Sequence, residues 1–360
     1  METVLVISAE TFSGKSAVCI TLGRRIRRDG YRVGYMKPLC MRVRRAERRA
    51  FDEDAAFVKQ VFELEEPLEH ISPLLLTSRL LEGMLKGEPQ PDYVQRVREA
   101  YATVSQGKDL MLLEGPNDWS EGTIVGLPAS RVADLFDARI LLVSRFTTLV
   151  EVDNILATRE AMAGHEFLGV VINQVPRARM NMIERLVRPF LEERGMPVLA
   201  ILQQDPILCA VSVNELAEHL EAEILCCPDH GDDLVEMMMV GAMSVDSALS
   251  YFRRQANKAV ITGGDRVDIQ LAALETSTTC LILTGDLRPN PLILTRAEEQ
   301  CVPILLVRGD TMTTVRCAED LFGRARFRQT SKIERFEALL DAHFDFLRFY
   351  QALSMARGKK

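Results

Sequence analysis

Short apolar runs alternate with amphipathic stretches along roughly the first 205 residues. The runs have the length and composition of buried strands, and the stretches between them repeat apolar positions at helical spacing. Predicted strands cover residues 4–7, 32–36, 110–113, 139–144, 168–172 and 198–202. Predicted helices cover residues 15–28, 52–64, 91–104, 128–136 and 180–194. This alternation predicts an α/β domain with a parallel sheet that helices cover on both faces.

A second and smaller α/β unit is predicted from about residue 210. Its expected helices span residues 215–220, 244–255 and 269–274, and its expected strands span 235–240, 258–261, 280–283 and 303–307. One last helix, over residues 332–355, carries apolar and aromatic residues near helical spacing. Packing onto its own domain is the usual role of such a helix, and a dimer contact is the alternative. We predict domains at residues 1–208 and 209–330, followed by a C-terminal helix at 331–360.

Composition narrows the class of protein. The 360 residues are 47% hydrophobic and 26% charged, as in ordinary globular proteins, and the net charge of −7 disfavours a general nucleic-acid binder. The apolar runs are too short to span a bilayer, and the first residues lack a signal-type pattern. We therefore expect a cytoplasmic protein that acts on neither membrane nor nucleic acid.

The candidate chemistry begins directly after the first predicted strand. Residues 8–16 read Ser-Ala-Glu-Thr-Phe-Ser-Gly-Lys-Ser and lead into a predicted helix. In such a loop, backbone N–H groups face a phosphate, Lys15 supplies a positive charge and Ser16 can hold Mg²⁺. Ala9 stands where a standard phosphate-binding loop (P-loop) has glycine, so an ordinary turn with a surface lysine is the alternative. We predict that the chain binds a nucleoside triphosphate here.

Polar residues at the ends of other predicted strands extend this site. Glu114 follows a buried strand, and Lys37 precedes a proline at the end of the second strand. Either Asp52 or Asp54 can supply a second carboxylate, although both also suit the start of a helix. Asn173 follows a later strand, and its amide is able to read a base edge. Strand ends of a parallel sheet gather at one edge, so these groups are expected to meet.

Together these residues resemble the dethiobiotin synthetase branch of P-loop proteins. The positions that match are Thr11, Gly14, Lys15, Ser16, Lys37-Pro38, Glu114-Gly115 and Asn173. The resemblance implies that both lysines contact phosphate or carboxylate-phosphate oxygens. It also implies that the acidic residues bind Mg²⁺ and that the asparagine contacts adenine.

The same region departs from that branch at three places. Ser8 replaces the first glycine, Glu10 replaces an aspartate, and Pro116-Asn117-Asp118 replaces a glycine-rich continuation. Pro116 has no N–H to offer a substrate. These departures disfavour the biotin-precursor reaction more than they disfavour nucleotide binding.

The second unit resembles the DRTGG domain. The matching segments are residues 240–244, Ile261-Thr262-Gly263-Gly264-Asp265-Arg266-Val267-Asp268-Ile269, residues 283–286 and residues 310–314. The order of the two units resembles the N-terminal region of long bacterial phosphotransacetylases, which implies regulation and oligomerisation. The acyltransferase domain of those enzymes is not in this sequence, so we expect a stand-alone relative without that activity. From the residues alone, the Gly263–Arg266 turn either holds an anion or closes on itself.

These observations predict an ATP- and Mg²⁺-binding regulatory or sensor protein. The alternative is an ATP-dependent carboxylate-activating ligase, and a scaffold with a vestigial P-loop is the third reading; any turnover is expected to be weak. A homo-oligomer is expected, and its second unit would bind a small effector or a protein partner. The predicted catalytic residues are Lys15 and Lys37. The predicted nucleotide-binding residues are Thr11, Ser13, Gly14, Lys15, Ser16 and Asn173, and the predicted metal ligands are Ser16, Asp54 and Glu114.

Overall fold

The computed structural model describes residues 1–41, 44–46, 49–322, 327 and 329–355. The chain divides into two compact units: unit 1 comprises Met1–Gln204 and Phe327–Lys360, and unit 2 comprises Asp205–Arg326. The predicted α/β class is confirmed in both units.

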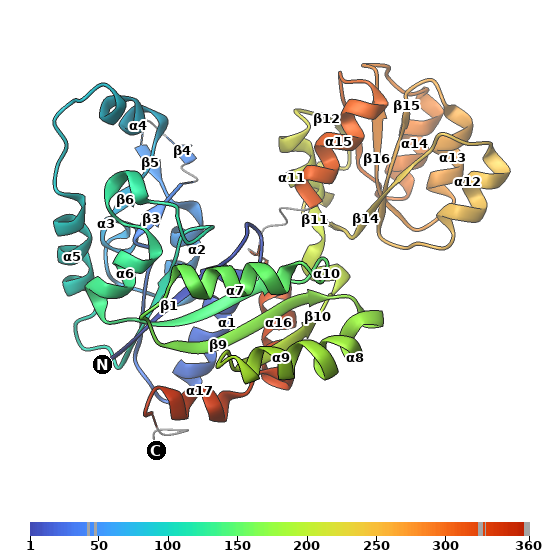
Figure 1. Cartoon of the computed structure of the whole chain (residues 1–360). Coiled ribbons are helices and arrows are strands. Elements are labelled where there is room, and N and C mark those ends of the chain that lie inside the picture. The colour runs from blue at the N-terminus through green and yellow to red at the C-terminus, as the bar shows by residue number, and fades with distance from the viewer. Residues whose placement is uncertain (42–43, 47–48, 323–326, 328, 356–360) are drawn as a thin grey trace. The chain divides into compact units, whose positions relative to one another are not determined.

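Unit 1 is built on a six-stranded parallel sheet in the order β10-β9-β8-β1-β7-β2 (Figure 1). Its strands and helices are β1 Glu2–Ser8, α1 Lys15–Arg28, β2 Val33–Met36, β3 Leu39–Cys40, β4 Arg44–Ala46, β5 Arg49–Phe51, α2 Glu53–Val61, α3 Leu68–Ile71, β6 Leu74–Leu75, α4 Ser78–Leu85, α5 Tyr93–Val104, β7 Leu110–Glu114, α6 Ala129–Phe136, β8 Arg139–Arg145, α7 Glu151–Ala161, β9 Phe167–Val175, α8 Met180–Met182, α9 Arg188–Glu193, β10 Val198–Gln203, α16 Thr330–His343 and α17 Phe346–Ala352. A one-turn π-helix, Ile183–Val187, joins α8 to α9.

Both faces of this sheet are buried, because successive residues of a strand point to opposite sides. Leu5 and Ile7 of β1 belong to an apolar cluster shared with α5, α6 and α7. Val4 and Val6 are equally buried but lie outside that cluster, on the alternate face. A central strand of this kind reads as a continuous apolar run. The strand that leads into the P-loop is therefore buried on both faces.

Unit 2 has a five-stranded sheet in the order β12-β17-β16-β15-β14, in which only the β12–β17 pairing is antiparallel. Its elements are α10 Pro206–Cys209, β11 Val211–Ser212, α11 Val213–His219, β12 Glu223–Cys226, β13 Leu234–Val235, β14 Met237–Val240, α12 Val245–Phe252, β15 Lys258–Gly263, α13 Val267–Leu274, β16 Thr278–Thr284, α14 Pro291–Glu299, β17 Ile304–Leu306 and α15 Thr311–Phe322. One apolar cluster joins the sheet to α12, α13 and α14, and a second joins it to α11 and α15.

The predicted single helix over residues 332–355 is two helices in the structure. Phe344 ends α16 with extended backbone, and its neighbour Asp345 caps α17 by accepting a hydrogen bond from the Arg348 N–H at 3.0 Å. The Asp345 N–H donates to the Leu199 carbonyl at 2.8 Å. Aspartate favours a cap over a helix interior, and this preference breaks the helix that the apolar spacing predicts.

Both C-terminal helices pack on unit 1. α16 lies against α1, where Asp341 pairs with Arg25 and Arg28, each at 2.9 Å. The Tyr350 hydroxyl of α17 donates to Asp29 at 2.7 Å. The aromatic and apolar residues that favoured a dimer contact are mostly buried within this unit. The fold of unit 1 therefore needs the segment after unit 2.

Candidate functional site

The turn between β1 and α1 has the shape of a P-loop. Gly14 precedes α1 with a left-handed φ of 96°, and a Cβ at this position would lie 2.3 Å from the Asn173 amide nitrogen. Both the φ angle and the close approach require glycine. No side chain caps the start of α1, so its first N–H groups remain available to an anion.

Lys15, the first residue of α1, is buried and points toward the end of β1. Its Nζ donates a hydrogen bond to the Ser8 hydroxyl at 3.0 Å. Burial lowers the pKa of Lys15; the charge of Lys37 lowers it further, and that of Glu114 opposes the change. A buried ammonium whose nearest partner is a neutral hydroxyl is a favourable place for a phosphate.

Glu114 lies at the carboxyl end of β7 and contacts two hydroxyl groups. Its Oε1 accepts from Ser16 at 2.7 Å, and its Oε2 accepts from Tyr35 at 2.8 Å. Burial raises the pKa of Tyr35, and the Glu114 charge raises it further. Mg²⁺ prefers such oxygen ligands and typically takes one or two carboxylates beside substrate phosphates. The described residues contain no cluster of three His, Cys, Asp or Glu side chains that could hold a metal ion.

Lys37, beyond β2, is held by two carboxylates. Its Nζ lies 3.2 Å from Asp52 and 3.4 Å from Asp54. Burial favours a lower pKa for Lys37, but Glu114, Asp52 and Asp54 outweigh burial, so the pKa is raised. The lysine is therefore a permanent cation within an acidic group.

The two candidate aspartates have different surroundings. Asp52 caps α2 by accepting hydrogen bonds from the Asp54 and Ala55 N–H groups, each at 3.0 Å, and it also accepts from Ser72. Its side chain is 1% exposed, against 38% for that of Asp54. Of the two aspartates, Asp52 has the helix-capping role that the sequence suggested as an alternative. Asp54 is more exposed, so its carboxylate is easier for a ligand to reach.

Asn173 holds the P-loop in place. Its Nδ2 donates to the Ser13 carbonyl at 2.9 Å, and its Oδ1 accepts from the Gln174 N–H at 2.9 Å. Both ends of the amide are engaged within the protein, so a contact with adenine stays a prediction. Thr11 is exposed on the loop, whereas the Ser13 hydroxyl is buried without a partner among the described residues.

Glu10 has features that sequence reasoning missed, since there it was only a departure from a family pattern. Its Oε1 accepts a hydrogen bond from the Arg145 N–H, while its Oε2 is buried without a partner among the described residues. Burial raises the pKa of Glu10. The sequence signal that could have identified Glu10 as a site residue is its position inside the loop of residues 8–16. The structure thus brings the carboxyl ends of β1, β7, β8 and β9 together at one site, as predicted for a parallel sheet.

In unit 2, the Gly263–Arg266 turn closes on its own protein. Arg266 pairs with Asp268 at 3.0 Å and donates to the Met243 carbonyl, also at 3.0 Å. The buried Gln270 amide donates to the Gly263 and Gly264 carbonyls. A Cβ on Gly264 would lie 1.8 Å from the Leu287 carbonyl oxygen, so only glycine fits. These contacts favour the alternative in which the turn closes on itself and disfavour the one in which it holds an anion.

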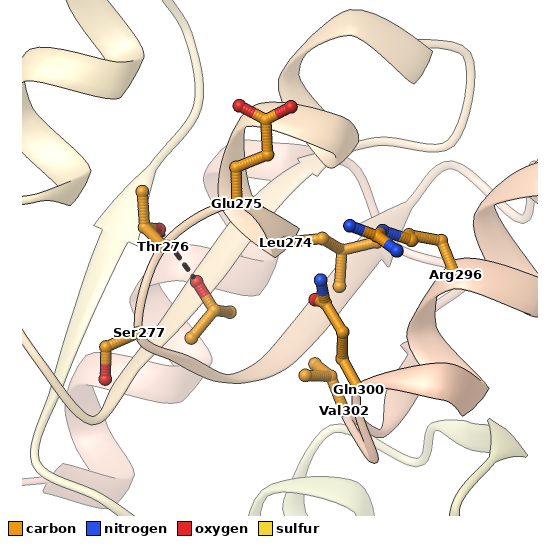
Figure 2. A pocket seen from close by; sticks show the side chains of 8 residues that line it. Leu274, Glu275, Thr276, Ser277, Arg296, Gln300 and Val302 are labelled. Carbon is orange, nitrogen blue, oxygen red and sulfur yellow. Dashed lines mark hydrogen bonds between the residues drawn. The ribbon is translucent and has the colours of Figure 1, made fainter.

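A shallow pocket of about 630 Å³ lies at the amino end of β16, away from that turn. Figure 2 shows its lining from the segment between α13 and β16 and from α14, with the hydrogen bond between Thr276 and Thr278. Arg296 and Gln300 point toward it (Figure 2). Arg296 and Gln300 lie outside the segments that resemble the DRTGG domain in the sequence.

Lys258, at the start of β15, lies beside this segment and is fully buried. Its Nζ donates to the Thr276 hydroxyl at 3.0 Å and to the Gln255 and Ser277 carbonyls at 3.1 and 2.8 Å. All three acceptors are neutral. Burial lowers the pKa of Lys258 to about 8.

This pKa predicts a pH-dependent stability of unit 2. Between pH 8 and pH 10.5 the unfolded chain keeps a proton on Lys258 that the folded chain has lost, so stability rises with pH over this window. Relative to a Lys258→Met variant, the wild type should gain about 2 kcal/mol between pH 7 and pH 10. Urea unfolding followed by far-UV circular dichroism tests this; parallel pH dependences in the two proteins would contradict it.

Comparison with known proteins places this geometry in a family. The AAA domain profile matches residues 2–212, and the DRTGG domain profile matches residues 215–321. Among solved structures, the chain is similar to the MinD cell division protein of Aquifex aeolicus (14% identity, TM-score 0.35, covering 58% of this chain and 84% of that one). It is also similar to the CBS and DRTGG domains of a Clostridium perfringens pyrophosphatase (17% identity, TM-score 0.28, covering 40% and 70%).

Curated relatives match over longer stretches. Phosphate acetyltransferase of Synechocystis is 24% identical over 368 residues, which cover 98% of this chain and 52% of the relative. The ATP-dependent dethiobiotin synthetase BioD of Caldicellulosiruptor saccharolyticus is 22% identical over 116 residues, covering 32% and 48%. The chain spans about half the length of the acetyltransferase. The resemblances to the dethiobiotin synthetase branch, to the DRTGG domain and to the N-terminal region of phosphotransacetylases are confirmed. The chain belongs to the AAA domain family, with a DRTGG domain following its P-loop domain.

Proposed function

We propose that the chain binds Mg-ATP in unit 1 and acts as a regulatory or sensor protein. One observation carries the proposal. The start of α1 combines a buried ammonium, that of Lys15, with the Ser16 hydroxyl, which is 2.7 Å from the Glu114 carboxylate. The Lys15 ammonium would bind phosphate oxygens. The Ser16 hydroxyl and the Glu114 carboxylate are oxygen ligands of the kind that a phosphate-bound Mg²⁺ takes.

The remaining predicted residues have defined places in this proposal. The loop N–H groups and Lys15 would hold the phosphates, with Thr11 and Ser13 on the same loop. Ser16 and Glu114 would hold Mg²⁺, and Asp54 is the candidate for a further carboxylate. Asn173 would keep the loop in its binding shape through the Ser13 carbonyl. Mg²⁺, when bound with the nucleotide, supplies charge neutralisation of the phosphates.

The ligase alternative asks more of Lys37 than its surroundings favour. A phosphorylated intermediate would have to attract its ammonium away from Asp52 and Asp54, both within 3.4 Å. We therefore expect slow or absent ATP turnover. Calorimetric titration with ATP, ADP, GTP and NADH, with and without Mg²⁺, tests the binding proposal. Dethiobiotin formation from diaminopelargonate, CO₂ and ATP at ordinary enzyme rates, about 1 s⁻¹ or faster, would favour the ligase.

The magnesium role is tested by Glu114→Gln. The amide keeps the shape and can still bond the Ser16 and Tyr35 hydroxyls, because both hydroxyls can rotate. We expect the variant to lose the magnesium dependence of ATP binding more than binding itself. Tyr35→Phe is the matched control, since it removes the hydrogen bond to Glu114 at 2.8 Å but keeps the charge. A normal magnesium dependence in Glu114→Gln would assign the carboxylate a structural role.

For unit 2 we propose binding of a small effector or a protein partner and participation in a homo-oligomer. The similarity of residues 215–321 to DRTGG domains supports a role distinct from that of unit 1. Light scattering of the full chain with and without Mg-ATP tests the oligomer; a strictly monomeric chain in both states would remove that part of the proposal.

A further inference from the structure

Ser8 connects the P-loop lysine to a distant segment of unit 1. Its hydroxyl accepts a hydrogen bond from Lys15 Nζ at 3.0 Å and donates one to the Asn117 carbonyl at 2.9 Å. Ser8 is fully buried, and its bond with Lys15 is buried as well, so water does not compete for that bond. A hydroxyl has a single proton to give, and here that proton goes to Asn117.

The segment that Ser8 contacts is a compact loop between β7 and α6. Asp118 accepts a hydrogen bond from the Ser120 N–H at 2.6 Å, and the Ala129 N–H donates to the Trp119 carbonyl at 3.1 Å. These bonds lie within the loop and do not depend on β1. Val125, Leu127 and Ala129 anchor the second half of the loop in the core that also holds Leu5 and Ile7. Its first half, residues 117–121, is therefore the part that can shift when the bond to Ser8 weakens.

Glu121 adds an electrostatic connection to the same loop. Its carboxylate accepts from the Asn117 N–H at 2.7 Å and from the Asn117 side-chain amide at 3.1 Å. The charge of Glu121 also acts on Lys15, where it favours the protonated form and raises the pKa against the larger effect of burial. The lysine thus attracts the loop through Ser8 and through Glu121.

We propose that Ser8 is a positioning residue that couples phosphate binding to residues 117–121 of this loop. The proposal rests on the nucleotide site proposed above. A phosphate that attracts Lys15 Nζ takes it from the Ser8 hydroxyl. An O–H group that no longer accepts from a cation is a weaker donor, so its bond to Asn117 weakens. The added negative charge also repels Glu121, and both effects release the loop.

The loop carries its own reporter. Trp119 is the only tryptophan of the chain, and its side chain is 40% exposed. Its fluorescence therefore reports the loop without any added label. The experiment titrates the full chain with Mg-ATP, measures affinity by calorimetry, and records Trp119 emission in the same samples. Ser8→Gly, which restores the family's residue, and Ser8→Ala, which keeps the Cβ, both remove the hydroxyl.

In the wild type we expect an emission change that saturates with nucleotide. Both variants should bind about fivefold more tightly, since Lys15 has one hydrogen bond fewer to break, and should show a several-fold smaller emission change. Binding without an emission change in the wild type, or an equal change in both variants, would overturn the coupling alone. Absence of binding in the wild type would overturn the proposed function, and the coupling with it.

Discussion

Phe349→Ala is expected to lower the free energy of unfolding of unit 1 by about 3–5 kcal/mol, the usual cost of emptying a buried phenylalanine site. Phe349 is fully buried in α17, and its ring packs against Phe344 and Tyr350 with centroids 5.5 and 5.9 Å apart. The same helix contacts β10 of the central sheet. The loss should therefore appear in the unit that carries the P-loop.

Trp119 makes this measurement specific, because the only tryptophan lies in unit 1. Urea unfolding followed by its emission gives the midpoint and slope for that unit. Leu347→Ala is the matched control on the same helix: the side chain is 52% exposed, and its removal should cost less than about 0.5 kcal/mol. Equal midpoints for the two variants would show that α17 does not stabilise unit 1.

Lys15→Ala is expected to weaken ATP binding by at least about 2 kcal/mol, close to thirtyfold, the scale of a charge-assisted phosphate contact. The fold should be retained, because the change removes a buried charge together with its desolvation cost. Calorimetry measures the affinity for ATP, and urea unfolding followed by Trp119 emission checks that the variant is folded. Lys86→Ala is the control, since Lys86 is exposed at the end of α4. Unchanged affinity in a folded Lys15→Ala protein would contradict a P-loop at this position.

Local patterns in the sequence predict the central sheet and the P-loop well. The apolar run before Gly14 is a buried strand, and the edge rule for parallel sheets brings Glu114 next to Ser16. These predictions need only neighbouring residues and one topological rule. The hydrogen bond between Lys15 and Ser8 could not be predicted from neighbouring residues. It depends on a hydroxyl at a position where the dethiobiotin synthetase branch has glycine, and on the loop that contains Asn117.

Long-range packing could not be predicted in the same way. The apolar spacing of residues 332–355 indicates a helix but contains no information about which domain it covers. Its partners on α1 are Arg25 and Arg28, about 300 positions earlier in the chain. The Leu199 carbonyl, which accepts from the Asp345 N–H where the helix divides, is likewise visible only once β10 is in place.

The discontinuity of unit 1 has a consequence for biosynthesis. Residues 205–326 form a contiguous unit and contain all of their own sheet, so unit 2 can finish folding while translation continues. Unit 1 starts before unit 2 but cannot cover the side of α1 that contacts α16 until residues 330–352 have been synthesised. During that interval the apolar surface of unit 1 that α16 and α17 cover in the finished fold stays exposed. Unit 1, whose first segment precedes unit 2 in the chain, is thus completed after it.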